Sequence, residues 1–270
     1  MERLKLTLAY TGKRFQGWQI QERVPGAGTG TNPRTVQGVV EEAFATILGG
    51  PEHMPRVHGA SRTDSGVHAV GQVAHVDVPE RAKPMDWQLA LNGVLPRDVS
   101  VVRVEHVDDE FHARFYSKRK IYTYGLWLSR RFVLPHRRGF VWMVDSLDRD
   151  AMLEAAALLT GKHDFAAFTN VGSVTKTTVR EVLGIEPVAC IQAGHVPGAP
   201  EWPEETWRFE ATGFLKQMVR NLMGCLVAVG RGKLRPADVQ HILDGKDRTR
   251  APMTAPAQGL TLQRIFYPDD

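Results

Sequence analysis

An arginine and an aspartate two residues apart stand in a polar segment that glycines bracket. The segment GASRTDSGVHA covers residues 59–69, with Arg62 and Asp64 near its centre and Gly59 and Gly66 beside them. The glycines predict a loop between two strands, and residues i and i+2 of an extended chain project to the same side. A guanidinium beside a carboxylate favours its charged form, and an ionised Asp64 on a loop could act as a nucleophile or a base.

The same two residues also fit a purely structural role. An Arg–Asp pair can pin a turn without taking part in any chemistry, and exposed pairs of this kind contribute little to stability. Residue types and spacing alone therefore leave two alternatives for Arg62 and Asp64, a catalytic carboxylate with its partner or a structural ion pair.

Positive charge is concentrated in one stretch of the chain. The net charge is +4 and the sequence pI about 9.1, which by itself indicates an acidic partner only weakly. Clustering is more informative, and it fits either a solvated basic face or a nucleic-acid contact surface. The clustered residues are Arg114, Lys118, Arg119, Lys120, Arg130, Arg131, Arg137 and Arg138.

Length and composition are those of a globular protein. The 270 residues, 43% of them hydrophobic and 24% charged, predict one or two domains. We expect a cytoplasmic protein with no membrane association, because no apolar run approaches the ~20 residues of a membrane span and no signal peptide stands at the start. The two cysteines, Cys190 and Cys225, fit neither a disulfide framework nor a zinc site. We expect Cys225 to be a small core residue.

Hydrophobic periodicity predicts the elements that must position these residues. Alternation predicts strands at 4–10, 72–78, 99–107, 117–128, 178–190, 205–213 and 260–266. Helical spacing predicts helices at 36–48, 84–93, 148–159, 215–230 and 236–243, and a Gly/Pro/Thr-rich stretch at 25–33 predicts a loop. The fold class is α+β, with two mixed domains at 1–109 and 110–270, each a mainly antiparallel sheet covered by helices.

The segment around Asp64 resembles the signature of TruA-type pseudouridine synthases, G-x-x-R-T-D-x-G-V-H-A-x-x-Q-V. Two segments depart from the family's pattern, a longer loop at 24–33 and Lys216-Gln217, where an aromatic or amide-rich pair is expected; neither touches the signature. The resemblance covers nearly the whole chain. Segments that resemble further family elements, in the same order, are residues 8–19, 35–38, 91–99, 111–115, 120–124, 163–168, 178–180, 213–221 and 255–260.

The resemblance implies that uridine is isomerised to pseudouridine at positions 38, 39 and 40 of tRNA, in the anticodon arm. The reaction adds and removes no atom, so we expect no cofactor and no metal. Asp64 would be the catalytic carboxylate, and two routes stay open: attack at C1′, or removal of the C2′ proton. Arg62 would hold the carboxylate, and Tyr122 would stack on the uracil, which must leave the base stack to react.

The resemblance also implies a cleft and a partner. A basic active-site cleft would lie between the two domains, with Arg220 pairing with Asp64 or with phosphate, and the protein would be a homodimer. Further substrate contacts are expected at Arg114, Lys118, Arg119, Lys120 and Arg180. Two other functions remain as alternatives. One is a non-catalytic RNA-binding module of the same fold; the other is a glycosidase or nucleosidase, which needs a second carboxylate that does not stand out near Asp64.

Overall fold

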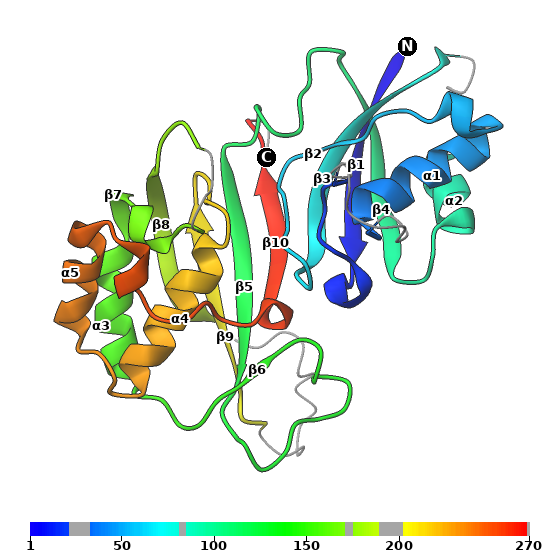
Figure 1. The fold of residues 1–270 in the computed structure, drawn as a ribbon. Coiled ribbons are helices and arrows are strands. Elements are labelled where there is room, and N and C mark those ends of the chain that lie inside the picture. The colour runs from blue at the N-terminus through cyan, green and yellow to red at the C-terminus, as the bar shows by residue number, and fades with distance from the viewer. Residues whose placement is uncertain (22–32, 81–84, 171–174, 189–201, 269–270) are drawn as a thin grey trace, which may run out of the picture. The chain divides into compact units, whose positions relative to one another are not determined.

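The computed structural model describes residues 1–21, 33–80, 85–170, 175–188 and 202–268. The chain is an α/β protein, and its described residues contain five α-helices together with β-sheet (Figure 1). They form two compact units: unit 1 is Met1–Lys118 with Leu262–Asp270, and unit 2 is Arg119–Thr261. The predicted domain limits, 1–109 and 110–270, stay a prediction, and each unit is described by itself.

The sheet of unit 1 is built around its first strand. Strand β1 (Glu2–Tyr10) pairs antiparallel with β3 (His68–Val78) on one side and with β4 (Val99–Val107) on the other. The short β2 (His58–Gly59) also pairs with β3, and β10 (Leu260–Phe266) is the next strand beside β3. Alternate side chains of β1 are fully buried, as the predicted strand requires: Leu4, Leu6 and Leu8.

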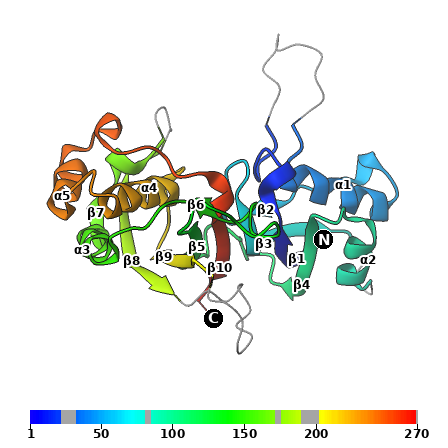
Figure 2. The same cartoon turned by 90° about the horizontal axis from the view of Figure 1, so that it is seen from below.

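Two helices pack on this sheet (Figure 2). Helix α1 (Val36–Leu48) begins after Thr35, whose side chain caps the first turn by accepting a hydrogen bond from the Gly38 amide. Helix α2 (Trp87–Val94) is capped by Asp86 in the same way. The rings of Phe44 and Trp87 lie 5.1 Å apart and join the two helices.

The sheet of unit 2 contains β5 (Arg119–Trp127), β9 (Glu204–Ala211), β8 (Val179–Val188) and β7 (Gly161–Asp164) in that order, all antiparallel. The two-residue β6 (Trp142–Met143) runs parallel to β5. Helices α3 (Arg149–Leu159), α4 (Met218–Gly230) and α5 (Pro236–Gly245) pack together in this unit (Figure 1). Arg220 is the one residue of α4 that is not buried.

The elements predicted from periodicity are present, with ends shifted by a few residues. Helix α4 begins at Met218 instead of 215 because Gln217 adopts a left-handed backbone (φ 61°), which a continuous helix does not allow. Strands β2, β6 and β7 were not predicted, since two to four residues are too short to show alternation. Most of the predicted 25–33 loop and Cys190 lie outside the described residues.

The core of the described residues contains a cysteine and methionines that are fully buried. Cys225 is fully buried, as expected of a core residue, and burial raises its thiol pKa to about 12. Met218 and Met223 are likewise fully buried. Within the described residues, no helix has both the length and the apolar character needed to cross a membrane.

Candidate active site

Asp64 lies on a loop between β2 and β3, where the glycines predicted a loop. Its backbone carbonyl accepts a hydrogen bond from the Val67 amide (3.1 Å), which closes a turn, and Gly66 within that turn has a positive φ of 82°. Asp64 is half-buried, whereas Arg62 is exposed. The predicted pairing of these two side chains stays a prediction.

A buried hydrogen-bond network holds the loop on its N-terminal side. The hydroxyl of Tyr10 on β1 lies 2.8 Å from the hydroxyl of Thr63, the residue before Asp64. From β3, the Gln72 amide donates to the Tyr10 hydroxyl (3.4 Å) and to the Ser61 carbonyl (2.7 Å). Tyr10, Thr63 and Gln72 are all buried, so each polar atom depends on its partners for satisfaction.

A second segment of the chain runs along the same loop. The Trp18 amide donates to the Thr63 carbonyl (3.1 Å), and the Gly66 amide donates to the Phe15 carbonyl (3.4 Å). Gly17, with φ 95°, permits this approach, because a Cβ atom there would lie 2.6 Å from the Thr63 carbonyl oxygen. Asp64 is therefore flanked by backbone that is fixed on both sides.

The start of α1 holds this second segment in turn. The side chain of Gln37 is buried; its carbonyl oxygen accepts from the Ile20 amide (3.0 Å), and its NH₂ group donates to the Val57 carbonyl (3.0 Å). The Gln37 backbone amide donates to the Trp18 carbonyl (3.0 Å). One glutamine thus connects the helix, the 15–20 segment and the chain that leads into β2.

A bidentate ion pair packs against Phe15, at the start of the 15–20 segment. Both terminal nitrogens of Arg34 donate to Asp98 at 2.8 Å, and its guanidinium lies 4.0 Å from the centre of the Phe15 ring. The hydrogen bond from Arg34 lowers the pKa of the Asp98 carboxyl, and the same bond raises the pKa of Arg34. Both side chains therefore stay charged at neutral pH and keep Phe15 in place.

Tyr122 and Tyr124 lie in unit 2, on β5. Tyr122 is only 6% exposed, and its ring meets that of Phe214 edge-on at 5.3 Å. Tyr124 is fully buried; its hydroxyl donates to the Pro256 carbonyl (2.7 Å), and burial raises its pKa. Both tyrosines are therefore buried in the core of unit 2, Tyr124 with its hydroxyl bonded to the Pro256 carbonyl and Tyr122 in edge-on contact with Phe214.

Arg220 lies in the first turn of α4, close to Tyr124. Its Nε donates to the Ala255 carbonyl (2.8 Å), and the Ala255 amide donates to the Arg220 carbonyl (3.1 Å). The positive charge of Arg220 acts to lower the pKa of Tyr124, although the effect of burial is larger. The helix and the segment before β10 hold this arginine jointly.

The remaining predicted basic residues have different environments. Arg114 and Lys118 are exposed, and Lys120 is half-buried. Arg119 forms an ion pair with Glu210 of β9. Arg180 donates to the carbonyls of Thr177 (3.0 Å) and Val179 (2.6 Å), and burial lowers its pKa.

The predicted site residues divide between the two units. Arg62, Asp64, Arg114 and Lys118 belong to unit 1, and Arg119, Lys120, Tyr122, Arg180 and Arg220 belong to unit 2. Within unit 1 the carboxylate stands on a fixed loop, and within unit 2 an aromatic ring and an arginine are each held by neighbours. That these residues line one cleft stays a prediction.

Comparison with known proteins assigns the chain to a family. A family model described as tRNA pseudouridine synthase matches residues 8–116 and 155–268. The chain belongs to the tRNA pseudouridine synthase family. A relative from Oleidesulfovibrio alaskensis, named tRNA pseudouridine synthase A, is 50% identical over 275 residues, 100% of this chain and 98% of the relative. A relative of the same name from Geobacillus kaustophilus is 39% identical over 269 residues, 100% of this chain and 96% of the relative.

The family predicted from the motifs is therefore confirmed, and with it the enzyme class, since a tRNA pseudouridine synthase is an isomerase. A solved structure titled "Crystal Structure of a Cbf5-Nop10-Gar1 Complex" also matches, over 97% of this chain and 59% of that one. Its TM-score is 0.33 and its identity 13%, so this match supports no argument.

Several residues that hold the Asp64 loop in this pseudouridine synthase were not singled out from the sequence. Tyr10, Gly17, Gln37 and Gln72 all occur within segments that resemble the family, but only the fold brings Tyr10, Gly17 and Gln72 to the Asp64 loop and Gln37 to the 15–20 segment that lies along it. Tyr10 and Thr63 are 53 residues apart in the chain. A single sequence contains no signal for such a contact.

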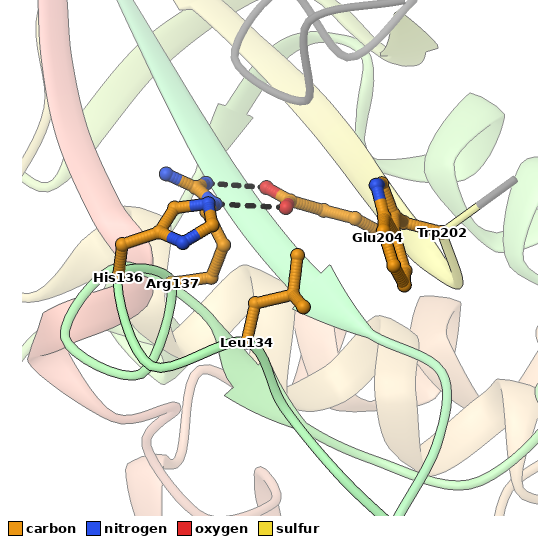
Figure 3. A pocket seen from close by; sticks show the side chains of 5 residues that line it. All are labelled: Leu134, His136, Arg137, Trp202 and Glu204. Carbon is orange, nitrogen blue, oxygen red and sulfur yellow. Dashed lines mark hydrogen bonds and ion pairs between the residues drawn. The ribbon is translucent and has the colours of Figure 1, made fainter. Parts of the chain in front are cut away.

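A pocket in unit 2 of the synthase lies apart from every predicted site residue. It encloses about 240 Å³ and is lined by Leu134, His136, Arg137, Trp202 and Glu204 (Figure 3). One wall is a bidentate ion pair between Arg137 and Glu204, whose side chains are 9% and 1% exposed. Because the pair satisfies both charges, the pocket has the character of a structural feature rather than of a reaction centre.

Proposed function

We propose that this tRNA pseudouridine synthase acts on uridines 38, 39 and 40 of the anticodon arm, with Asp64 as its catalytic carboxylate. The observation that carries the proposal is the setting of Asp64. It occupies the aspartate position of the R-T-D signature. Hydrogen bonds from Gln72 to the Ser61 carbonyl and from the Trp18 amide to the Thr63 carbonyl fix the backbone before it, and the Thr63 hydroxyl is hydrogen-bonded to that of Tyr10. Such fixed support is what a catalytic side chain requires and what a solvated surface turn does not need.

The reaction asks three things of the enzyme. The N1–C1′ bond must break, the uracil must turn, and C5 must bond to C1′ and then lose its proton, while N1 gains one. A carboxylate can assist the first step by attacking C1′, as in glycoside hydrolysis, or by removing the C2′ proton. Both routes place the Asp64 oxygens next to the ribose, and both conserve the composition of the nucleotide.

The neighbouring residues take the roles expected from the resemblance. Tyr122 stacks on the extruded uracil, and the edge-on contact with Phe214 supports its ring at a fixed angle. Arg62 holds the Asp64 carboxylate, and its exposure also suits a residue that helps to displace the target nucleotide from its stack. Arg114, Lys118, Arg119 and Lys120 contact phosphates, Arg180 also contacts the substrate, and Arg220 pairs with Asp64 or with phosphate. A basic cleft between the two domains, a homodimeric assembly and a cytoplasmic location complete the proposal.

The test is to incubate the purified protein and its Asp64→Asn variant with unmodified tRNA and to map pseudouridine by chemical tagging. Asparagine keeps the size of the side chain but cannot act as a base or as a nucleophilic carboxylate. We expect pseudouridine at positions 38–40 with the wild type and a loss of at least about 10³-fold in rate with the variant. tRNA binding should change by less than about threefold, because the substitution removes no positive charge.

Asp108→Asn is the matched control, since it removes the same charge from an exposed position of unit 1. It should keep full activity. An Asp64→Asn variant as active as this control would refute the role of Asp64 and favour a structural aspartate. Release of free uracil would instead support a glycosidase, and modification of other uridines would refute the proposed target positions.

A further inference from the structure

An aromatic side chain in unit 1 is left in solvent although its neighbours hold it firmly. Phe115 is 74% exposed, more than any other aromatic side chain among the described residues. A phenyl ring gains free energy by leaving water, so an exposed ring of this size indicates a contact surface when its position is fixed.

Other rings support Phe115 from behind. The ring centre of His112 lies 4.2 Å from that of Phe115, with 35° between the planes. His112 in turn meets His75 of β3 at 4.6 Å, and His75 is stacked on His58 at 4.9 Å and 17°. His75 is only 3% exposed. A column of rings thus runs from the buried strand to Phe115 at the surface.

The backbone around Phe115 is held as well. The amides of Arg114 and Phe115 both donate to Nδ1 of His112, at 3.1 and 3.3 Å. The Ala113 amide donates to Nδ1 of His75 (3.2 Å), and the Ala113 carbonyl accepts from the hydroxyl of Tyr267 (2.7 Å). Phe115 therefore presents its ring at a fixed place instead of moving freely in solvent.

Positive charge accompanies the ring. The guanidinium of Arg114 lies 5.9 Å from the centre of the Phe115 ring, within the range of a cation–π contact. Lys118, three residues further on, is exposed. A supported ring with an arginine beside it and a lysine nearby in the chain matches the way proteins hold unpaired bases, which stack on an aromatic face while cations contact the phosphates.

We propose that Phe115 is a stacking platform for an unpaired base of the RNA substrate, in addition to the stacking of Tyr122 on the reacting uracil. The proposal rests on the proposed function for the identity of the RNA. A protein partner is the less favoured occupant, because a stable protein interface buries about 800 Å² on each side, and one exposed ring beside an arginine offers little of that.

The experiment compares Phe115→Ala and Phe115→Trp with a matched control, Leu89→Ala. Leu89 is 73% exposed and lies on α2 of the same unit, so its truncation removes similar apolar surface away from the ring column. tRNA binding is measured by fluorescence anisotropy, pseudouridine formation by tagging kinetics, and folding by thermal unfolding. The Phe115→Ala variant should bind tRNA about tenfold more weakly, with KM raised and kcat changed less than twofold. The Phe115→Trp variant should bind tRNA as tightly as the wild type, because tryptophan keeps an aromatic face at this position.

The salt dependence separates stacking from charge. Phe115→Ala should leave the slope of log affinity against log salt unchanged, whereas Arg114→Ala should reduce it by about one. The platform would be overturned if Phe115→Ala bound tRNA with wild-type affinity. A change in the oligomeric state of that variant with no loss of tRNA affinity would overturn it too. If the wild type binds tRNA through Phe115 but forms no pseudouridine, the proposed function fails and the platform stands. If the wild type and Phe115→Ala form pseudouridine equally well, the platform fails and the proposed function stands.

Discussion

At the residue scale, the hydroxyl of Tyr10 connects the strand that it belongs to with the residue before Asp64. We expect Tyr10→Phe to lower the free energy of unfolding by about 1–3 kcal/mol, because the buried Thr63 hydroxyl and Gln72 amide each lose a partner. The kcat for pseudouridine formation should fall about tenfold, since the carboxylate is then held less well. Urea unfolding and initial rates at saturating tRNA measure the two effects.

The control for this change is Tyr116→Phe. Tyr116 belongs to the same unit and is 41% exposed, so loss of its hydroxyl leaves no buried group unsatisfied. Its unfolding free energy should change by less than about 0.5 kcal/mol. Equal stability and kcat in the Tyr10→Phe and wild-type proteins would show that the network does not position the loop.

His75 gives the molecule a pH-dependent stability. Burial, followed by the neighbouring His112 and His58, lowers its pKa from 6.5 to about 4; Arg3 acts in the same direction and Asp77 against it. The unfolded chain therefore binds a proton between pH 6.5 and 4 that the folded chain does not. Stability from His75 is fully present above pH 6.5 and is lost as the pH falls towards 4, by up to about 3 kcal/mol.

The measurement is urea unfolding at several pH values across this window. His75→Asn keeps a side-chain acceptor near Nδ1 but cannot titrate, so its stability should fall less steeply than that of the wild type. Asp77, which raises the pKa of His75, does not itself cause the change, because the hydrogen bond from Arg3 lowers the pKa of the Asp77 carboxyl and keeps it charged over the same pH range. His241→Asn, at an exposed position of α5, should follow the wild-type curve. Identical curves for His75→Asn and wild type would contradict this assignment.

At the element scale, the 15–18 segment and the Asp64 loop are held together by a close approach of their backbones. Gly17→Ala would place a methyl group 2.6 Å from the Thr63 carbonyl at a φ of 95°, which disfavours any side chain. We expect a loss of at least about 3 kcal/mol in unfolding free energy and at least tenfold in kcat. Gly49→Ala is the control, because Gly49 has a φ of 102° but no atom within 4 Å of the added methyl.

The Gly49→Ala variant should lose only about 1 kcal/mol, from the left-handed backbone alone, and should keep its activity. The difference between the two variants therefore reports the contact with the Asp64 loop and not the backbone conformation. If both variants lose the same stability and neither loses activity, the close approach of the 15–18 segment to the Asp64 loop does not contribute to function.

Elements were predictable where burial alternates regularly. Leu4, Leu6 and Leu8 are all fully buried, and the strand that contains them was predicted from that pattern. The first residues of β3 were missed, because its glycine at 71 is explained only by a neighbouring strand: a Cβ there would overlap the Gln263 carbonyl oxygen. Close approaches between distant segments leave no periodic trace in a sequence.

The site was predictable only in part, for the same reason. Asp64, Arg62 and Tyr122 were predicted as site residues through the resemblance to a family, since spacing alone left a structural ion pair as an alternative for Arg62 and Asp64. The support from Tyr10 and Gln72 comes from two other strands, and the Gln72–Tyr10 hydrogen bond joins residues 62 positions apart. Hydrogen bonds between residues so far apart in the chain can be identified only once the fold is known.

At the scale of the whole molecule, a net charge of +4 predicts tRNA binding that weakens with salt. The log of the affinity should fall linearly with the log of the salt concentration, and single variants should show which cations contribute. Lys118 is exposed, so Lys118→Ala should reduce the slope by about one. Arg119 already forms an ion pair with Glu210, so Arg119→Ala should reduce the slope by clearly less.

Lys162→Ala serves as the third variant, since Lys162 is an exposed residue of β7 outside the basic stretch. All three substitutions lower the net charge by one, so a difference between their slopes must come from where the charge lies and not from the total. Anisotropy titrations of tRNA from 50 to 300 mM KCl measure the slopes. Equal slopes in all three variants would mean that tRNA responds only to the overall charge, and Lys118 would then lose its place as a phosphate contact.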